Sequence, residues 1–372
     1  MALFPAMTRL TLHAPAKVNL FLAITGQRSD GFHDLVSLAV PLDWGDELEL
    51  RVLAEGAGRA GGAGAQSGET RLRCEASTPA CEVPASADNL VQRAAAAFRA
   101  ATGFSRPVDF ILKKRVPVGA GLGGGSSDAV AALRGLNALA AAENPRCALS
   151  EAALGELAAQ LGADCTFFVH GRPAIMRGSG ERVKPLNRSA SATATADSGA
   201  VSASAASAFL RGQRLFLCKP AFGVNTAWAY GEMRERARAA GLASGSVYLA
   251  EEEAEALCER WRRAIGEGAS DVRMLGALTF NNMEPVVFAK YPALPVLATE
   301  FRERFGLTLR MSGSGSACFA FLPAYADKPV AGAAAPSGAL AAERALVEKL
   351  TDCVHALWGP TAFTRVVEIA GA

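Results

Sequence analysis

Apolar side chains alternate with polar ones in several short stretches of the chain, which is typical of half-buried β-strands. In residues 47–53, for example, Leu48, Leu50 and Val52 fall on one face. The same pattern, or a short apolar run, predicts further strands at residues 10–24, 35–40, 108–113, 165–169, 215–219 and 317–322.

Helices are predicted where apolar positions recur every three to four residues between capping residues. One helix follows Ser150 and ends at Gly162. The others cover residues 89–101 with Asp88 as the cap, 126–142 with Ser126 or Ser127 near the cap, 226–239, 251–265 and 293–305. Strands and helices are mixed without strict alternation, which favours the α+β class over a doubly wound parallel sheet.

Three stretches lack any such period, and each is rich in small residues: 55–68, 189–207 and 330–342. We expect them to be surface loops or disordered insertions. A chain of 372 residues is long enough for two domains of about 100–200 residues each. The predicted division is an N-terminal domain at 1–188 and a C-terminal domain at 209–372, with 189–208 as an insertion or linker.

Charge and cysteine content narrow the class of protein. The formal net charge is +2, so no broad basic field is expected to attract nucleic acid or an anionic membrane. No apolar run reaches the roughly 18–20 residues needed to cross a bilayer. The eight cysteines are scattered without a C-x-x-C pair, which argues against zinc and disulfides and favours the reducing cytoplasm. The oligomeric state is left open.

A glycine-rich loop is the most informative string in the chain. Five of its eleven residues are glycine, which allows the backbone to turn its amide N–H groups towards an anion. A helix begins directly after it and adds its own unpaired donors, and the two serines offer hydroxyls to a phosphate. The predicted nucleotide-phosphate loop consists of Pro117, Val118, Gly119, Ala120, Gly121, Leu122, Gly123, Gly124, Gly125, Ser126 and Ser127.

The loop alone does not decide between classes of nucleotide enzyme. Gly119, Gly121 and Gly124 match the spacing of a dinucleotide-binding fingerprint, but no βαβ unit with an acidic ribose ligand follows. The Gly-Lys-Ser/Thr ending of a Walker A loop is missing. A dehydrogenase and a kinase therefore both remain open at this point.

Two more strings lie in order around the loop, and together the three resemble the motifs of the GHMP kinases, a family of metabolite kinases. Residues 15–20 read Pro-Ala-Lys-Val-Asn-Leu, and residues 311–319 read Met-Ser-Gly-Ser-Gly-Ser-Ala-Cys-Phe. The resemblance implies an α+β fold of two domains with the active site in the cleft between them. It also implies ATP as the phosphoryl donor, with Mg²⁺ whose ligands are left unassigned.

Further strings resemble one type of GHMP kinase in particular: 17–22, 31–33, 88–90, 114–117 and 161–164. They imply that the acceptor is the 2-hydroxyl of a methylerythritol that carries a cytidyl diphosphate. Another GHMP kinase, acting on homoserine, a mevalonate or a sugar, is the alternative. A non-catalytic nucleotide-binding module is a third reading, which the presence of both Lys17 and Asp164 opposes.

The resemblance assigns roles to single residues. Asp164 would be the catalytic base and Lys17 its charge partner, although a turn aspartate and an edge-strand lysine are the plainer readings. The string after Asp164 departs from the family, because Cys165-Thr166 replaces an apolar pair. Beyond the glycine loop, the adenosine would be flanked by Asn89, Leu90 and Lys114. The acceptor would be bound by Asn19, Phe32, His33, Tyr230, Ser312, Gly313, Ser314 and Gly315.

Overall fold

The computed structural model describes residues 9–53, 69–186, 209–240, 247–267, 271–323 and 337–370. Contacts divide the chain into two compact units. Unit 1 consists of Met1–Lys17, Trp44–Val118 and Gly123–Gly171, and unit 2 of Val18–Asp43, Gly119–Leu122 and Arg172–Ala372. Two long strands, β1 (Arg9–Gln27) and β2 (His33–Val52), each contribute to both units. The division at residues 189–208 stays a prediction.

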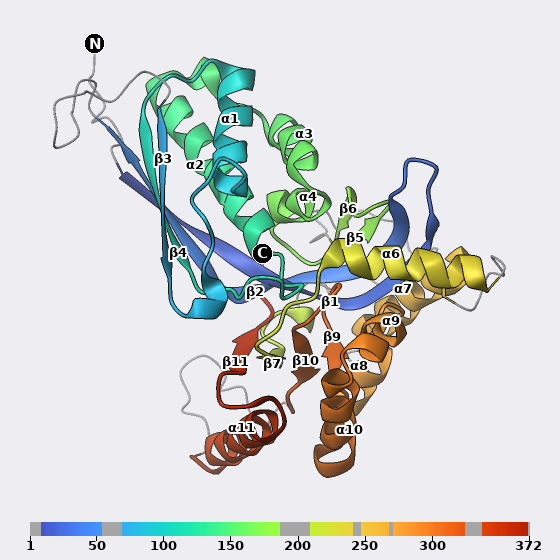
Figure 1. Cartoon of the computed structure of the whole chain (residues 1–372). Coiled ribbons are helices and arrows are strands. Elements are labelled where there is room, and N and C mark those ends of the chain that lie inside the picture. Colours follow the sequence, from blue (N-terminus) through green and yellow to red (C-terminus); the bar gives the residue numbers. More distant parts are fainter. Residues whose placement is uncertain are drawn as a thin grey trace. The chain divides into compact units, whose positions relative to one another are not determined.

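Unit 1 combines strands with a group of helices. The second half of β2 pairs antiparallel with β4 (Val108–Lys114), which pairs parallel with β3 (Thr70–Ala76). Figure 1 shows α1 and α2 together on one side of β3 and β4. The helices of unit 1 are α1 (Leu90–Thr102), α2 (Gly124–Glu143), α3 (Glu151–Leu161) and α4 (Ala163–His170), with short 3-10 turns at Pro79–Cys81 and Pro145–Cys147.

Unit 2 contains a four-stranded sheet in the order β11-β7-β10-β9, in which all pairs are antiparallel. Its strands are β7 (Arg214–Lys219), β9 (Arg310–Met311), β10 (Cys318–Phe321) and β11 (Phe363–Glu368). Further strands pair with the unit 2 parts of β1 and β2: β8 (Phe280–Asn281) with β1, and β5 (Ala174–Arg177) with β2 and with β6 (Arg182–Pro185).

Six described helices complete unit 2. They are α6 (Thr226–Ala239), α7 (Glu251–Gly266), α8 (Val272–Leu278), α9 (Glu284–Lys290), α10 (Ala293–Phe305) and α11 (Ser337–Trp358). Aromatic side chains form much of the core, and Phe216 of β7 lies 5.9 Å from Phe301 of α10 between ring centroids. The indole N–H of buried Trp261 donates to the Leu278 carbonyl, so this large side chain leaves no buried donor unpaired.

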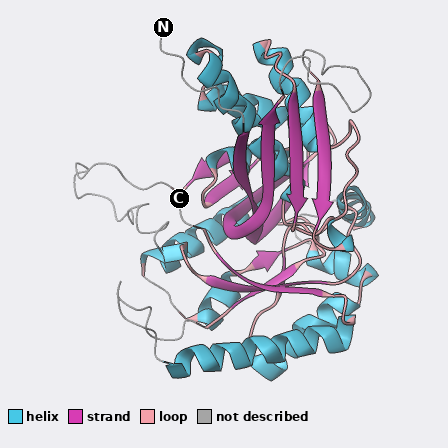
Figure 2. Cartoon of the chain, turned by 90° about the vertical axis from the view of Figure 1, so that its left-hand side faces the viewer, coloured by secondary structure: helices cyan, strands magenta, loops and turns pink. Residues whose placement is uncertain are grey.

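The predicted α+β class is confirmed, and Figure 2 shows that both element types make up a large part of the chain. The helices predicted at 226–239 and 293–305 have the predicted bounds. The strand predicted at 165–169 is wrong, because these residues form α4. The strands predicted at 35–40 and 47–53 are one continuous strand, β2.

One predicted cap is also wrong. Asn89, not Asp88, caps α1, and its side-chain oxygen accepts a hydrogen bond from the Val91 N–H. Helix α2 begins at Gly124, two residues before the predicted start, and its cap is Gly123 in the left-handed region, so both serines lie near the cap. The prediction for α3 is confirmed, since the Ser150 side chain accepts from the Ala153 N–H.

The predicted insertions fall mostly outside the described residues. This holds for 55–68 and 189–207 entirely, and for 330–336 of the third. Residues 337–342 are the start of α11, so the loop predicted there is wrong. Alanine has the highest helix propensity, which explains why this alanine-rich segment forms the first turns of the helix. Within the described part of the chain, no helix is both long and apolar enough to cross a membrane.

Candidate active site

Lys17 and Asp164 form an ion pair in unit 1. The Lys17 Nζ atom lies 3.3 Å from the Asp164 Oδ2 atom. Lys17 is part of β1 and its side chain is 4% exposed, whereas the Asp164 side chain is 37% exposed. Asp164 lies in the first turn of α4, just after Gly162. The pair therefore combines a held ammonium with a carboxylate that a ligand can still reach.

The end of the glycine loop lies against this pair. Gly123 has a φ of +71°. A Cβ atom there would lie 3.0 Å from the Lys17 Cγ atom and 2.9 Å from the Phe168 ring. Glycine is required at this position, both for its backbone conformation and for the close approach of Lys17. The last residue of the predicted phosphate loop before α2 is thus in contact with the predicted catalytic lysine.

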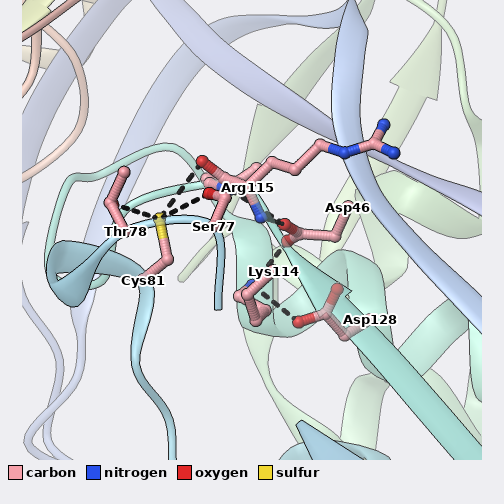
Figure 3. Close-up of polar contacts among 8 residues, drawn as sticks. Asp46, Ser77, Thr78, Cys81, Lys114, Arg115 and Asp128 are labelled. Carbon is pink, nitrogen blue, oxygen red and sulfur yellow. Dashed lines mark hydrogen bonds and ion pairs between the residues drawn. The ribbon is translucent and has the colours of Figure 1, made fainter. Parts of the chain in front are cut away.

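A buried cluster of three charged side chains lies beside the start of α2 (Figure 3). The Lys114 Nζ atom donates to Asp46 Oδ2 at 2.5 Å and to Asp128 Oδ2 at 2.8 Å. All three side chains are at most 4% exposed. The sequence prediction placed Lys114 near the adenosine but identified neither carboxylate.

Burial raises the pKa of Asp128 to about 8, against the attraction of Lys114, and the neighbouring charge of Asp46 adds to the increase. Burial alone would lower the pKa of Lys114, but the two carboxylates outweigh it and the pKa is raised. Near neutral pH the Asp128 carboxyl therefore carries its proton for much of the time. The cluster then holds one ammonium and one carboxylate.

The middle of the glycine loop, Gly119–Leu122, makes its contacts in unit 2. The Ser316 N–H donates to the Gly119 carbonyl at 3.2 Å, and the Ala317 N–H donates to the Ala120 carbonyl at 3.0 Å. The Ser312 hydroxyl donates to the Gly121 carbonyl at 3.1 Å. The structure thus brings the loop together with Ser312 and the residues that follow it, almost 200 positions away.

Asn19 and Asn281 form hydrogen bonds that hold residues 311–313 in place beside the glycine loop. The Asn19 N–H donates to the Ser312 hydroxyl at 3.3 Å, and its side-chain amide donates to the Ser37 hydroxyl at 2.8 Å. The Asn281 amide donates to the carbonyls of Met311 and Gly313, at 2.9 and 2.8 Å. Asn19 was a predicted site residue, whereas Ser37 and Asn281 were not identified from the sequence.

The aromatic residues predicted to bind the acceptor lie in unit 2. The His33 ring lies 4.9 Å from the Tyr230 ring and 5.7 Å from the Tyr248 ring, between centroids. The His33 Nε2 atom and the Tyr248 hydroxyl are 3.1 Å apart and share a hydrogen bond. His33 is 6% exposed, and burial lowers its pKa, with the nearby Arg234 charge as a further cause. Phe32 is 63% exposed.

Asn89 and Leu90, predicted to flank the adenosine, lie at the start of α1. Besides capping this helix, Asn89 donates through its amide to the Pro84 carbonyl at 2.9 Å. Leu90 lies close to the loop, because a Cβ atom at Gly125 would be 3.5 Å from its Cδ1 atom. Ser314 of the C-terminal string shares a hydrogen bond of 2.8 Å with Thr226.

The predicted site residues therefore divide between the units. Unit 1 brings together Lys17, Asp164, Leu90, Lys114 and Gly123–Ser127, and unit 2 brings together Asn19, Gly119–Leu122 and Ser312–Gly315. His33 and Tyr230 are also neighbours in unit 2. Tyr248 was missed because a lone tyrosine beside a helix has no distinguishing pattern. Asp46 was missed because an acidic residue in a strand usually lies at the surface.

No group of three or more potential His, Cys, Asp or Glu metal ligands exists among the described residues. Mg²⁺ in nucleotide sites is commonly held by one or two carboxylates together with substrate phosphates, and such a site needs no protein cage.

Comparison with known families gives two matches in sequence order. The model for "GHMP kinases N terminal domain" matches residues 89–172, and the model for "GHMP kinases C terminal" matches residues 254–335. A curated 4-diphosphocytidyl-2-C-methyl-D-erythritol kinase of Synechococcus sp. (strain CC9902) is 35% identical, over 84% of this chain and 87% of its own. The enzyme with the same name in Burkholderia thailandensis is 32% identical, over 87% and 89%.

Solved structures agree with these matches. A crystal structure of a 4-(cytidine 5'-diphospho)-2C-methyl-D-erythritol kinase is 28% identical, with a TM-score of 0.63 over 96% of this chain and 99% of that chain. A homoserine kinase from Cytophaga hutchinsonii is 15% identical, with a TM-score of 0.62 over 100% and 98%. At that identity, the second likeness concerns the fold alone.

Proposed function

Because the chain belongs to the GHMP kinase family and is an ATP-dependent small-molecule kinase, we propose that it phosphorylates the 2-hydroxyl of 4-diphosphocytidyl-2-C-methyl-D-erythritol. This reaction belongs to the non-mevalonate route to isoprenoid precursors. Two kinds of observation support it. Relatives with this substrate in their name match most of the chain at 32–35% identity. The ion pair between Lys17 and Asp164, two residues expected for such a kinase, is the second.

One observation carries the proposal: the ion pair of Lys17 and Asp164 lies at the end of the glycine loop, where Gly123 contacts the Lys17 side chain. A phosphate held by the loop and an acceptor held by the carboxylate would then be near each other. Phosphoryl transfer depends mainly on positioning and on charge stabilisation, which this arrangement supplies.

In the proposed reaction the Asp164 carboxylate accepts a hydrogen bond from the acceptor hydroxyl and orients it. The hydroxyl oxygen forms a bond to the γ-phosphorus while the bond from the γ-phosphorus to the β,γ-bridging oxygen breaks. ADP leaves with that electron pair, and the hydroxyl proton passes to Asp164. The Lys17 ammonium, 3.3 Å from the carboxylate, stabilises negative charge on the transferring group.

The nucleotide phosphates would be bound by the loop backbone and by the first N–H groups of α2. The positive end of the α2 dipole favours this position for an anion. The Ser127 hydroxyl fits the same role, because it is buried and has no hydrogen-bond partner among the described residues. Mg²⁺ would accompany ATP and neutralise charge on the phosphates.

The cytidine preference would depend on the aromatic residues of unit 2. Phe32 is exposed and can stack on a base, and such stacking contributes about 1–3 kcal/mol. The His33 ring contacts Tyr230, and its Nε2 atom is bonded to Tyr248, so its Nδ1 atom would be the one that pairs with an edge of the pyrimidine. We also propose that the protein acts in the cytoplasm.

Phosphate transfer from Mg-ATP to a panel of alcohols tests the proposal. The panel contains the cytidyl diphosphate substrate, the same methylerythritol phosphate without its cytidyl group, homoserine, mevalonate and a hexose. We expect turnover with the first compound and at least about a hundredfold lower kcat/KM with the others. Preference for homoserine, mevalonate or the hexose would assign the chain to a different GHMP kinase, and ATP binding without transfer would indicate a non-catalytic module.

A further inference from the structure

We propose that Asp46, Lys114 and Asp128 form a positioning triad that fixes both ends of the glycine loop and thereby sets the affinity for ATP. The proposal rests on the kinase function proposed above. It adds two residues, Asp46 and Asp128, that the predicted contacts with the nucleotide do not include.

Asp46 fixes the chain where it enters the loop. Strand β4 ends at Lys114, so the next two N–H groups have left the strand. The Asp46 Oδ1 atom accepts hydrogen bonds from both, at 2.5 Å from the Arg115 nitrogen and 2.8 Å from the Val116 nitrogen. Asp46 is completely buried, so water does not compete for these bonds. The carboxylate therefore determines the direction in which the chain leaves β4 towards the loop.

Lys114 fixes the chain where it leaves the loop. Its ammonium is bound to Asp128, which lies in the second turn of α2. A Cβ atom at Gly124, the first residue of α2, would lie 3.1 Å from the Lys114 Nζ atom. The ammonium thus lies directly against the helix terminus whose N–H groups would bind phosphate. Through the same nitrogen it is linked to Asp46, which holds the other end of the loop.

The charge of the triad suits a phosphate site. With a proton on Asp128 the triad is neutral, and without it the triad carries a net negative charge near the helix terminus. Asp128 faces Lys114, Asp46 and the Cys74 thiol of β3. Burial raises the pKa of Cys74, and the charge of Asp128 raises it further. The Asp128 Oδ1 atom has no hydrogen-bond partner among the described residues, which a protonated carboxyl tolerates better than an anion.

The first test compares Asp46→Asn with Glu47→Gln. An asparagine at 46 keeps an oxygen for the two backbone N–H groups but turns a second donor towards Lys114, so it breaks the link between the two ends. Glu47 is the matched control, because its carboxylate lies 2.6 Å from Lys113 on the same two strands and is partly exposed. We expect Asp46→Asn to raise both the KM for ATP and the Kd for ADP at least about tenfold.

In the same variant, the KM for the acceptor should stay within about twofold of wild type, and Glu47→Gln should leave every constant within about twofold. An ADP affinity that Asp46→Asn leaves unchanged would overturn the proposal. So would equal increases in KM for both substrates, which would indicate a general structural defect.

A second variant, Asp128→Asn, tests the proposal even if Asp46→Asn does not fold. The wild-type affinity for ADP should weaken several-fold between about pH 7.5 and 9 as Asp128 loses its proton, and Asp128→Asn should remove most of this dependence. Identical pH profiles for the two proteins would contradict the role of Asp128. ADP binding is measured without an acceptor, so the proposed acceptor can fail while the triad is still tested.

Discussion

At the scale of single residues, the pair of Lys17 and Asp164 is asymmetric. The ammonium is buried and held, whereas more than a third of the carboxylate side chain faces solvent. In the proposed reaction, an acceptor hydroxyl can reach such a carboxylate while the carboxylate keeps its contact with the ammonium. The asymmetry fits the proposal that Asp164, rather than Lys17, contacts the acceptor hydroxyl.

We expect Asp164→Asn to lower kcat by at least about a hundredfold, because an amide cannot accept the proton, while ATP still binds. Steady-state kinetics and direct nucleotide titration measure the two effects. Glu151→Gln is the matched control, since Glu151 is likewise the acidic residue in the first turn of its helix. Turnover close to wild type in Asp164→Asn would exclude Asp164 as the base.

Sequence patterns identified Lys17 and Asp164 because both lie in strings shared with a family. The triad could not be found in this way. Asp46 and Asp128 are 68 and 14 positions from Lys114, and only the pairing of β2 with β4 and the packing of α2 bring them together. An isolated aspartate in a strand, or in an alanine-rich helix, is indistinguishable from a surface residue until the fold is known.

At the scale of elements, regular periodicity predicted the helices well, whereas short apolar runs gave mixed results, because 317–322 contains strand β10 as predicted but 165–169 does not form a strand. Helix α6 has the predicted bounds, whereas the apolar run at 165–169 forms α4. Five residues with two aromatic rings and two β-branched side chains fit a strand equally well, and packing in unit 1 decides. The continuity of β2 was hidden by Pro41 and Gly45. Glycine is needed there, because a Cβ atom at 45 would lie 2.1 Å from the Ala14 carbonyl oxygen.

The glycine loop allows a prediction at this scale. Gly121 has a φ of +73°, and a Cβ atom there would lie 2.2 Å from the Ser312 carbonyl oxygen. We expect Gly121→Ala to destabilise the fold by at least about 1–2 kcal/mol, the cost of the left-handed conformation alone. Chemical denaturation measures the effect.

Gly125→Ala serves as the control for Gly121→Ala. Gly125 is helical, and among the described residues its Cβ atom would meet only the Leu90 side chain, at 3.5 Å. Alanine in a helix is favoured over glycine by roughly 0.5–1 kcal/mol, so this variant should be as stable as wild type or more stable. Equal stability of Gly121→Ala and wild type would show that the Ser312 contact tolerates a side chain.

At the scale of the whole molecule, the family match spans both units, whereas the residues between 54 and 68 and between 187 and 208 lie outside the described structure. The sequence match to a curated relative and the structural match to a solved kinase each cover most of the chain. A prediction for the molecule as a whole therefore has to rest on the described residues. The buried triad allows one such prediction, which concerns the stability of the fold.

Stability should depend on pH through Asp128. Its folded pKa of about 8 is above the ordinary value of 3.8, so the folded state binds more protons than the unfolded state between these values. The free energy of unfolding therefore falls as pH rises through this window. The raised pKa of Lys114 affects stability in a different pH range. The stability that Lys114 contributes is present below its ordinary pKa of 10.5 and is lost at higher pH.

Thermal unfolding at about pH 5 and pH 8 measures the dependence. We expect the Tm of Asp128→Asn, relative to wild type, to increase from the lower to the higher pH. A constant difference between the two proteins would mean that Asp128 titrates similarly in the folded and unfolded states.

The hydrogen bonds between Gly119–Ala120 and residues 316–317 also have a consequence for deuterium exchange. The Ser316 and Ala317 amides can exchange with solvent only when their bonds to the Gly119 and Ala120 carbonyls open. Their exchange rates therefore report on the glycine loop, although the two amides lie almost 200 positions further along the chain. A nucleotide that stabilises the loop should therefore slow deuterium exchange in a peptide that contains Ser316 and Ala317 but none of the loop residues.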